Sequence, residues 1–327
     1  MKFSFALAAA ALPLAAADTL VNVLTGAGEN TLLALVASVP AILTVLESFN
    51  GTLFAPTDAA LAATVAAGFN ASDLTAATNV LEYHAAPGTP FSGVGFTGSA
   101  FLTTLQGNPV EAVAVSSGIQ IHSAFGIPAA NVVKSLPYDG GYIHIIDQTL
   151  IPPANIVDVA TAANLTSFLS ALTTAGLAST VAGLSNVTIL APTNTAFAAI
   201  ASVAATLTVD QLKTILLTHV ISGIVYSTDI IAAKSLPNVA TLSTATLDIE
   251  FNGTNVLISA AENKSPATVI AADVLADNIV VHVIDTVLLP DLSAPTTAVY
   301  SAPSNVYSSA ASMFVGAGVT AAASFFF

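Results

Sequence analysis

The sequence of 327 residues contains no cysteine and no arginine. Without cysteine the chain can form neither disulfides nor zinc–thiolate sites, and thiol catalysis is excluded. Without arginine it has no guanidinium group for bidentate recognition of phosphate or carboxylate. Five lysines stand against 19 aspartates and glutamates, which gives a formal net charge of −14. A chain this acidic repels a phosphate backbone, so nucleic acid is excluded as a partner.

Charge of either sign is scarce, since only 7% of the residues are charged while 54% are hydrophobic. This composition supplies ample material for cores and argues against general disorder. At roughly 150 residues per domain, the length predicts about two domains.

The N-terminus has the pattern of a secretory signal peptide. Met1 and Lys2 precede the apolar run Phe3–Leu14, and the small residues Ala15–Ala17 follow it. A basic start, a short apolar stretch and a small-residue end are typical of a cleaved signal. We expect residues 1–17 to be removed; a buried N-terminal helix is the alternative.

The C-terminus combines a polar stalk and an apolar tail. Residues 291–312 are rich in Ser, Thr, Pro and Ala, and residues 313–327 are almost entirely apolar. Fifteen helical residues are too short for a hydrocarbon core of roughly 30 Å. The pattern predicts a GPI signal, with Ser301, Ser304 or Asn305 as the attachment residue. A tail that merely packs or frays is the alternative.

A secreted chain makes its Asn-x-Ser/Thr tripeptides candidate glycosylation sites on exposed loops. They occur at Asn50, Asn70, Asn164, Asn186, Asn252 and Asn263.

An internal repeat organises the middle of the chain. Thr52-Leu-Phe-Ala-Pro-Thr-Asp58 returns as Thr188-Ile-Leu-Ala-Pro-Thr-Asn194, and Gly141–Pro152 returns as Ile279–Pro290. His84 and its apolar neighbours also return around His219. The nearly constant displacement of roughly 135 residues indicates two copies of one domain.

Both copies begin with helical spacing of apolar residues and end with period-two alternation, which predicts an α+β fold. Thr208 and Gln211 indicate a capping box. We place the domains at 18–153 and 154–290. Because the linker Pro152–Ala154 is short and stiff, we expect the two domains to be rigidly linked.

The two repeated boxes and the central histidine resemble the fasciclin (FAS1) domain, from Asp18 to Pro290. The resemblance implies β-sheets packed with helices, in a domain used by secreted or lipid-anchored adhesion and matrix proteins. It implies no catalytic residues. It also links Tyr83-His84 with integrin-type adhesion in animal members, although the second copy has Thr218-His219.

The motif residues also have structural interpretations. His84 and His219 fit buried rings that bond a neighbouring loop, near Thr57-Asp58 or Thr193-Asn194. Asp58 aligns with Asn194, which favours stabilisation of a turn, because either side chain can bond the backbone.

His144 and His282 lie on predicted strands, on the opposite face from Asp147 and Asp285, so no catalytic pair converges. The histidines show no metal-ligand spacing, and no metal or cofactor is expected. Gly93–Gly98 matches GxGxxG but lacks the surrounding strand and helix, so it predicts a glycine-rich loop.

The sequence favours a non-enzymatic adhesion or wall-matrix protein at the cell surface, attached to the membrane only by a GPI lipid. Its expected partner is a cell-surface or matrix protein or polysaccharide, including a second copy of itself. The alternative is an extracellular module that binds an apolar small molecule or lipid in a cleft between helices and sheet.

Overall fold

The computed structural model describes residues 19–88 and 90–293, and it divides into two compact units between Ala154 and Asn155. We call them unit 1 and unit 2 and describe each by itself. The predicted signal peptide, the predicted GPI attachment residues and the apolar tail lie outside the described residues.

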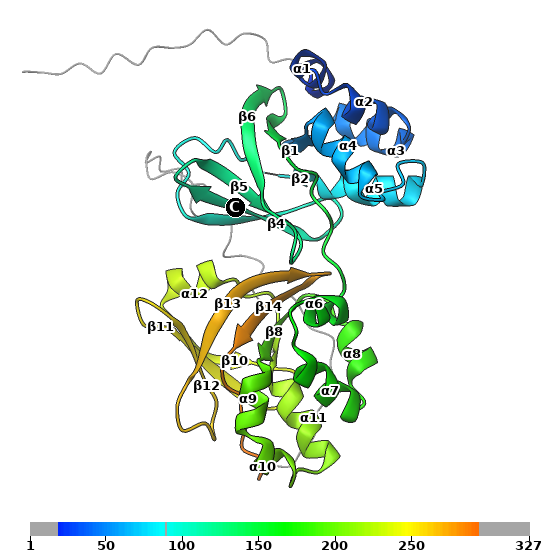
Figure 1. Cartoon of the computed structure of the whole chain (residues 1–327). Coiled ribbons are helices and arrows are strands. Elements are labelled where there is room, and N and C mark those ends of the chain that lie inside the picture. Colours follow the sequence, from blue (N-terminus) through cyan, green and yellow to red (C-terminus); the bar gives the residue numbers. More distant parts are fainter. Residues whose placement is uncertain (1–18, 89, 294–327) are drawn as a thin grey trace, which may run out of the picture. The chain divides into compact units, whose positions relative to one another are not determined.

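Unit 1 places its helices before and between the first strands, and its sheet comes mostly from the second half (Figure 1). The helices are α1 (Leu20–Ala27), α2 (Asn30–Ala37), α3 (Pro40–Glu47), α4 (Asp58–Ala66) and α5 (Leu74–Tyr83). The strands are β1 (Gly51–Pro56), β2 (Ala85–Pro87), β3 (Ser99–Thr103), β4 (Pro109–Val115), β5 (Gly118–His122), β6 (Ala130–Tyr138) and β7 (Gly141–Ile146). The sheet has the order β2-β1-β7-β6-β5-β4-β3.

Unit 2 repeats this plan with two more helices among the described residues. Its helices are α6 (Ile156–Ala162), α7 (Thr166–Thr174), α8 (Ala178–Ala182), α9 (Asn194–Ala199), α10 (Ala201–Ala204), α11 (Val209–Thr218) and α12 (Ser227–Ala233). Its strands are β8 (Val187–Pro192), β9 (Val220–Ser222), β10 (Ser235–Ala240), β11 (Thr246–Phe251), β12 (Val256–Ser259), β13 (Ala267–Ala276) and β14 (Ile279–Ile284). The sheet order β10-β11-β12-β13-β14-β8-β9 contains the same parallel central pair as unit 1.

Each sheet has an apolar core on both faces, because successive side chains of a strand point in opposite directions. In unit 1, Leu53 and Ala55 of β1 join the cluster that includes the helices, while Phe54 joins the cluster on the other face. In unit 2, Ile189 and Leu190 divide in the same way. The strands β1 and β8 are therefore buried along their whole length.

The predicted α+β fold is confirmed. The helical spacing from residue 31 to 49 forms two helices, because Pro40 has no N–H to continue α2 and Val39 takes a non-helical conformation before it. The capping box of Thr208 and Gln211 is present at the start of α11. Among residues 19–88 and 90–293, no helix is long and apolar enough to cross a membrane.

Candidate functional site

His84 lies at the C-terminal end of α5 and is only 2% exposed. Its Nδ1 is 2.7 Å from the carbonyl oxygen of Val80, one turn earlier, and a carbonyl can only accept, so Nδ1 carries the proton. Nε2 then accepts a hydrogen bond of 2.9 Å from the backbone N–H of Leu150. The ring thus connects the end of α5 to the segment after β7.

His219 makes the same connection in unit 2. Its Nδ1 donates to the carbonyl oxygen of Ile215, and its Nε2 accepts from the N–H of Leu288, at 2.7 and 2.9 Å. The expectation that these rings bond near Thr57-Asp58 and Thr193-Asn194 was wrong. In each unit the last strand along the chain, β7 or β14, runs parallel to the first one, β1 or β8. The segment that follows β7 or β14 therefore leaves the sheet at the same end as the segment that follows β1 or β8. It passes there over the C-terminal end of α5 or α11.

Burial sets the charge of both rings. It lowers the pKa of His84 and of His219 from the ordinary value of 6.5 to about 4, although the hydrogen bonds to the carbonyl oxygens oppose this. Both rings are neutral at pH 7, and both nitrogens are already bonded to the backbone. They cannot act as proton carriers for an external substrate in this conformation.

His144 of β7 forms a second connection, in which two side chains hold one backbone residue. Its Nε2 donates to the carbonyl oxygen of Phe91 at 2.7 Å, and the N–H of Phe91 donates to Oγ1 of Thr52 at 2.8 Å. The Oγ of Ser135 bonds Nδ1 of the same ring. The loop after β2 is therefore fixed to β1 and β7 through both polar groups of Phe91.

His282 of β14 holds Val225 in the same way. Its Nε2 donates to the carbonyl oxygen of Val225 at 2.9 Å, and the N–H of Val225 donates to Oγ1 of Thr188 at 2.8 Å. The N–H of Asp273 supplies the bond to Nδ1. We call this arrangement the threonine–histidine clamp. Sequence reasoning missed Thr52 and Thr188, although both begin the repeated box.

The carboxylates near these histidines are bonded elsewhere. Asp147 accepts from the N–H of Asn131 at 2.7 Å, and Asp285 accepts from the N–H of Thr268 at 2.8 Å. Each carboxylate ties the end of the last strand to the neighbouring strand. The histidines and carboxylates are satisfied separately.

The two threonines that follow the repeated strands begin the next helices. The hydroxyl of Thr57 accepts from the N–H of Ala60, and that of Thr193 accepts from the N–H of Ala196. These are N-cap bonds, which satisfy a backbone donor that the first turn of a helix leaves free.

Asp58 and Asn194 stabilise a helix contact and not their own turn, which corrects the sequence expectation. Asp58 Oδ1 accepts from the N–H of Thr31 in α2, and Asn194 Oδ1 accepts from the N–H of Ser167 in α7, both at 2.9 Å. Asn194 also donates its amide to the carbonyl oxygen of Asn164. A side chain that supplies an acceptor to the first turn of a distant helix fixes that helix against the sheet.

Tyr83 and His84 do not form a surface. Tyr83 is 0% exposed, and its hydroxyl donates to the carbonyl oxygen of Pro109 at 2.9 Å. Its counterpart Thr218 is also 0% exposed and bonds the carbonyl oxygen of Thr214. An adhesion partner cannot reach these side chains in the folded unit.

The part of the chain that the structure describes holds no group of three or more acidic or histidine side chains suited to a metal ion. Within that part, His122 on β5 is the exposed histidine, while the other four are buried. Gly93–Gly98 forms a loop and leads into strand β3, not into the helix that a dinucleotide site needs.

Five of the six candidate glycosylation asparagines are exposed, and the sixth, Asn263, is half-buried. Asn263 donates its amide to the carbonyl oxygen of Val287 and accepts from the N–H of Leu289. The side chain that a glycan would need is thus held against the segment after β14. The exposed asparagines are Asn50, Asn70, Asn164, Asn186 and Asn252.

These features define a class of tandem α+β domains whose motif histidines join backbone segments. The chain matches the fasciclin domain twice, over residues 27–152 and 163–290. It belongs to the fasciclin domain family.

The chain is similar to several curated proteins. It is 30% identical over 181 residues to a fasciclin-like arabinogalactan protein of Cercospora beticola, covering 55% of this chain and 46% of the relative. It is 30% identical to transforming growth factor-beta-induced protein ig-h3 of Sus scrofa, covering 62% and 30%, and 32% identical to human periostin, covering 52% and 20%. These matches span less than half of each relative's own length.

Among solved structures, the chain is similar to the FAS1 domain pair from the insect cell adhesion molecule fasciclin I. The identity is 17% and the TM-score 0.39, over 80% of this chain and 96% of that one.

Proposed function

We propose that this chain is a non-enzymatic adhesion or matrix-interaction protein of the cell surface that acts through the outer surfaces of its two fasciclin domains. The observation that carries the proposal is the internal use of the motif residues. In both copies the buried histidines and the box threonines bond backbone groups of their own domain, which leaves no reactive group among them.

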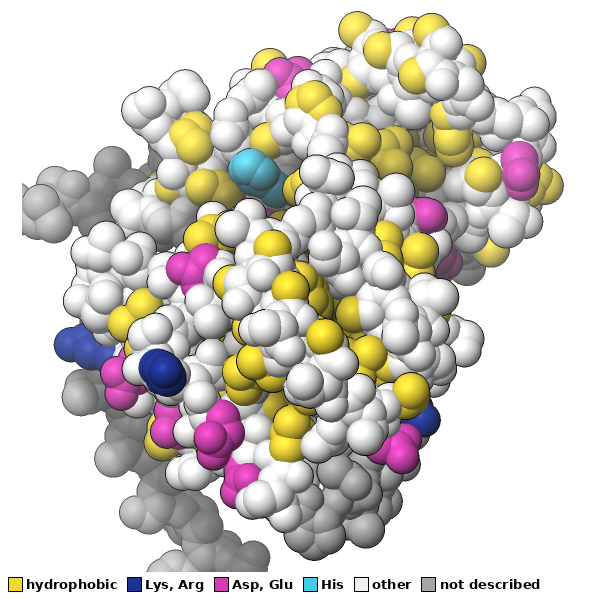
Figure 2. All heavy atoms as spheres, turned by 60° about the horizontal axis from the view of Figure 1, so that its bottom comes forward, with side chains coloured by type: hydrophobic (Ala, Val, Ile, Leu, Met, Phe, Trp, Pro, Cys, Tyr) yellow, Lys and Arg dark blue, Asp and Glu magenta, His cyan; other side chains and the backbone are white. Residues whose placement is uncertain are grey.

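The surface supports contacts that depend little on ion pairs. Figure 2 shows one face on which acidic and lysine side chains are few and hydrophobic side chains lie scattered among uncharged ones. The described residues contain one ion pair, between Lys213 and Asp210. Weak apolar and hydrogen-bonded contacts that many copies repeat would supply avidity.

An equivalent bulge in the two copies supplies a candidate contact point. The pairing of β6 with β7 shifts between Val132 and Lys134, and that of β13 with β14 shifts between Val269 and Ala271. The residue between them in each case is apolar and exposed, at 63% for Val133 and 57% for Ile270. A bulge re-aims a side chain, so both copies present a branched apolar side chain at the same position.

Display at the cell surface is the second part of the proposal. It is supported by the signal-peptide pattern of residues 1–17 and by the GPI pattern of residues 291–327. The fungal relative is named an arabinogalactan protein, which supports a wall or matrix setting for this chain as well. Phosphatidylinositol-specific phospholipase C should release the protein from cells. Retention after this treatment, together with no effect of substitutions at Ser301, Ser304 and Asn305, would contradict the anchor.

Bead clustering tests adhesion. Beads carrying glycosylated residues 18–300 should cluster with each other or bind isolated cell-surface polysaccharide, and the effect should rise with surface density. A Val133→Ser/Ile270→Ser double variant should cluster less. Val65→Ser is the control, because Val65 on α4 is 49% exposed and is not part of either bulge. No clustering at any density would refute the adhesion proposal.

A further inference from the structure

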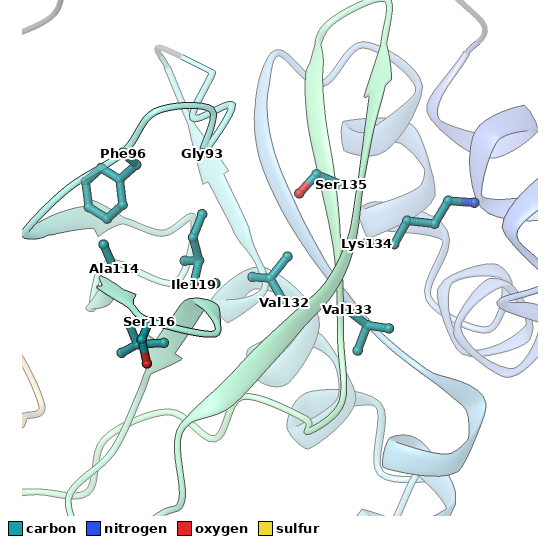
Figure 3. A pocket seen from close by; sticks show the side chains of 11 residues that line it. Gly93, Phe96, Ala114, Ser116, Ile119, Val132, Val133, Lys134 and Ser135 are labelled. Atoms are coloured by element: carbon teal, nitrogen blue, oxygen red, sulfur yellow. The ribbon is translucent and has the colours of Figure 1, made fainter.

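A hollow of about 450 Å³ opens on the sheet of unit 1, beside the glycine-rich loop Gly93–Gly98. Phe96 of the glycine-rich loop forms one wall, and Ala114 of β4, Ile119 of β5 and Val132 of β6 form the floor (Figure 3). Ser135 lies at its edge. The volume lies within the range of roughly 300–1,000 Å³ that is common for small-molecule sites.

Unit 2 fills the equivalent place with its own side chains. The segment after Val225 forms α12, whose Ile230 is 2% exposed and packs on the sheet with Leu247, Ile249 and Val256. Figure 1 shows α12 on the side of the unit 2 sheet away from α6 and α7.

The strand residue under this place also differs between the copies. Phe251 of β11 pairs with Val256 as Ala114 of β4 pairs with Ile119. Phe251 is partly buried and packs against the unit 2 core, so a phenyl ring occupies the position where unit 1 has only a methyl group. The hollow is therefore a property of unit 1 and not of the shared fold.

The walls of the hollow are held in place before any ligand arrives. Phe91 is fixed by the threonine–histidine clamp, and its ring meets Phe96 edge-on with centroids 4.9 Å apart. Gly93 lies so close to the floor that an added Cβ would stand 2.5 Å from Cδ1 of Ile119. Its φ of +71° also suits glycine. A wall fixed in this way loses little freedom on binding.

The net charge of unit 1 disfavours an anionic ligand. Lys134 lines the hollow, but its ammonium group extends to the far side of β6, away from Phe96 and Ile119 (Figure 3). Acidic residues outnumber this one lysine between residues 19 and 154, and they are Glu29, Glu47, Asp58, Asp73, Glu82, Glu111, Asp139 and Asp147. An apolar ligand with a carboxylate or sulfonate would meet repulsion without a cation to pair with.

We propose that the hollow is a binding site for a neutral, flat, apolar small molecule, whose face contacts Phe96 and Ile119. This site lies between the glycine-rich loop and the sheet, and not between helices and sheet where the sequence alternative placed an apolar ligand. It does not rest on the adhesion proposal, although Val133 of the β6 bulge also lines the hollow.

The test uses two probes with one ring system. N-phenyl-1-naphthylamine is neutral, and 8-anilinonaphthalene-1-sulfonate carries a sulfonate. In fluorescence titrations of the full secreted chain, the neutral probe should bind saturably with one site per chain and more tightly than the anionic one. Equal affinities would overturn the selection for a neutral ligand.

A filling variant locates the site. Ala114→Phe places in unit 1 the ring that unit 2 already accommodates, and it should weaken binding of the neutral probe by about tenfold or more, because the ring occupies the ligand's space. Ala62→Phe is the matched control, since Ala62 is an exposed residue of α4 far from the lining residues in sequence. Equal binding by Ala114→Phe and the wild-type chain would refute the site.

A measurement on the wild-type chain removes any dependence on the folding of the variant. The methyl resonances of Val132 should shift on addition of N-phenyl-1-naphthylamine, while those of its counterpart Val269 should not. Saturable binding that leaves the Val132 methyls unmoved would place the probe elsewhere and overturn the proposal.

Discussion

The two units use the same residues where a side chain joins two backbone segments by hydrogen bonds, and different residues where a side chain only covers a helix contact or a face of the sheet. The connections through His84 and His219 have the same atoms, distances and lowered pKa. A buried backbone N–H without a partner is costly, so each copy needs these bonds. The histidines that supply these bonds therefore occur in both copies, because without them each domain would bury backbone groups that lack a partner.

The differences lie at the contact between the first helices and at the sheet face. In unit 1, Glu29 precedes α2 and is buried near Asp58, whereas unit 2 has Leu165 and Asn194 at the corresponding places. Burial and the Asp58 carboxylate raise the pKa of Glu29. Unit 2 thus has two uncharged residues where unit 1 has two neighbouring carboxyl groups.

Removal of the joining histidines should have the largest effect. His84→Ala or His219→Ala leaves a buried N–H and a carbonyl unpaired and opens a cavity, so each should lower the unfolding free energy of its unit by about 3–5 kcal/mol. Hydrogen exchange of the Leu150 amide should become faster in His84→Ala, and that of the Leu288 amide in His219→Ala. His122→Ala is the control, because His122 is exposed; a similar loss there would contradict this account.

Acid should destabilise both units, and unit 2 more than unit 1. A buried histidine whose pKa is about 4 binds fewer protons than the unfolded chain, so stability present above pH 6.5 is lost as the pH falls toward 4, by up to about 3 kcal/mol per ring. Glu29 acts in the opposite direction, because its raised pKa lets folded unit 1 take up a proton first.

Hydrogen exchange of peptides from each unit between pH 7 and pH 5 measures this difference. Stability that does not change over this range in either unit would show that the rings are not buried as neutral groups.

Swapping the residues of the two units at the helix contact should change stability less. Glu29→Leu gives unit 1 the residue of unit 2 and removes a buried carboxylate whose pKa burial and Asp58 raise, although the hydrogen bond that the Asp58 backbone donates to it is lost. The variant should therefore stabilise unit 1 at pH 7 by less than the histidine variants destabilise it. Urea unfolding measures the change. The reciprocal Leu165→Glu should destabilise unit 2, and a stabilising effect of both variants would contradict the comparison.

The smallest effect concerns glycosylation. Asn263 is half-buried and bonded to Val287 and Leu289, whereas Asn252 is exposed on a turn of the same unit. Mass spectrometry of glycopeptides from the secreted protein should find Asn252 occupied more often than Asn263. Removing the Asn263 sequon by Ser265→Ala should leave stability within about 0.5 kcal/mol. Full occupancy of Asn263 would show that its internal bonds do not limit modification.

Sequence alone revealed the repeat, the α+β order and the histidines as structural residues. These follow from local patterns: apolar spacing distinguishes helices from strands, and the capping box at Thr208 is encoded within four residues. It misplaced the partners of His84 and His219 and missed the threonines of the clamp, because those bonds join residues far apart in the chain.

The sequence by itself therefore determined which segments form helices and strands, and which motif residues the two copies share. Only the tertiary structure decided which backbone groups the histidines hold, that Tyr83 is closed to partners, and that unit 1 has a hollow where unit 2 has a helix and a phenyl ring. The physical reason is that hydrogen bonds and cavities depend on the distance between atoms in space, and strand pairing brings together residues that the sequence separates by tens of positions.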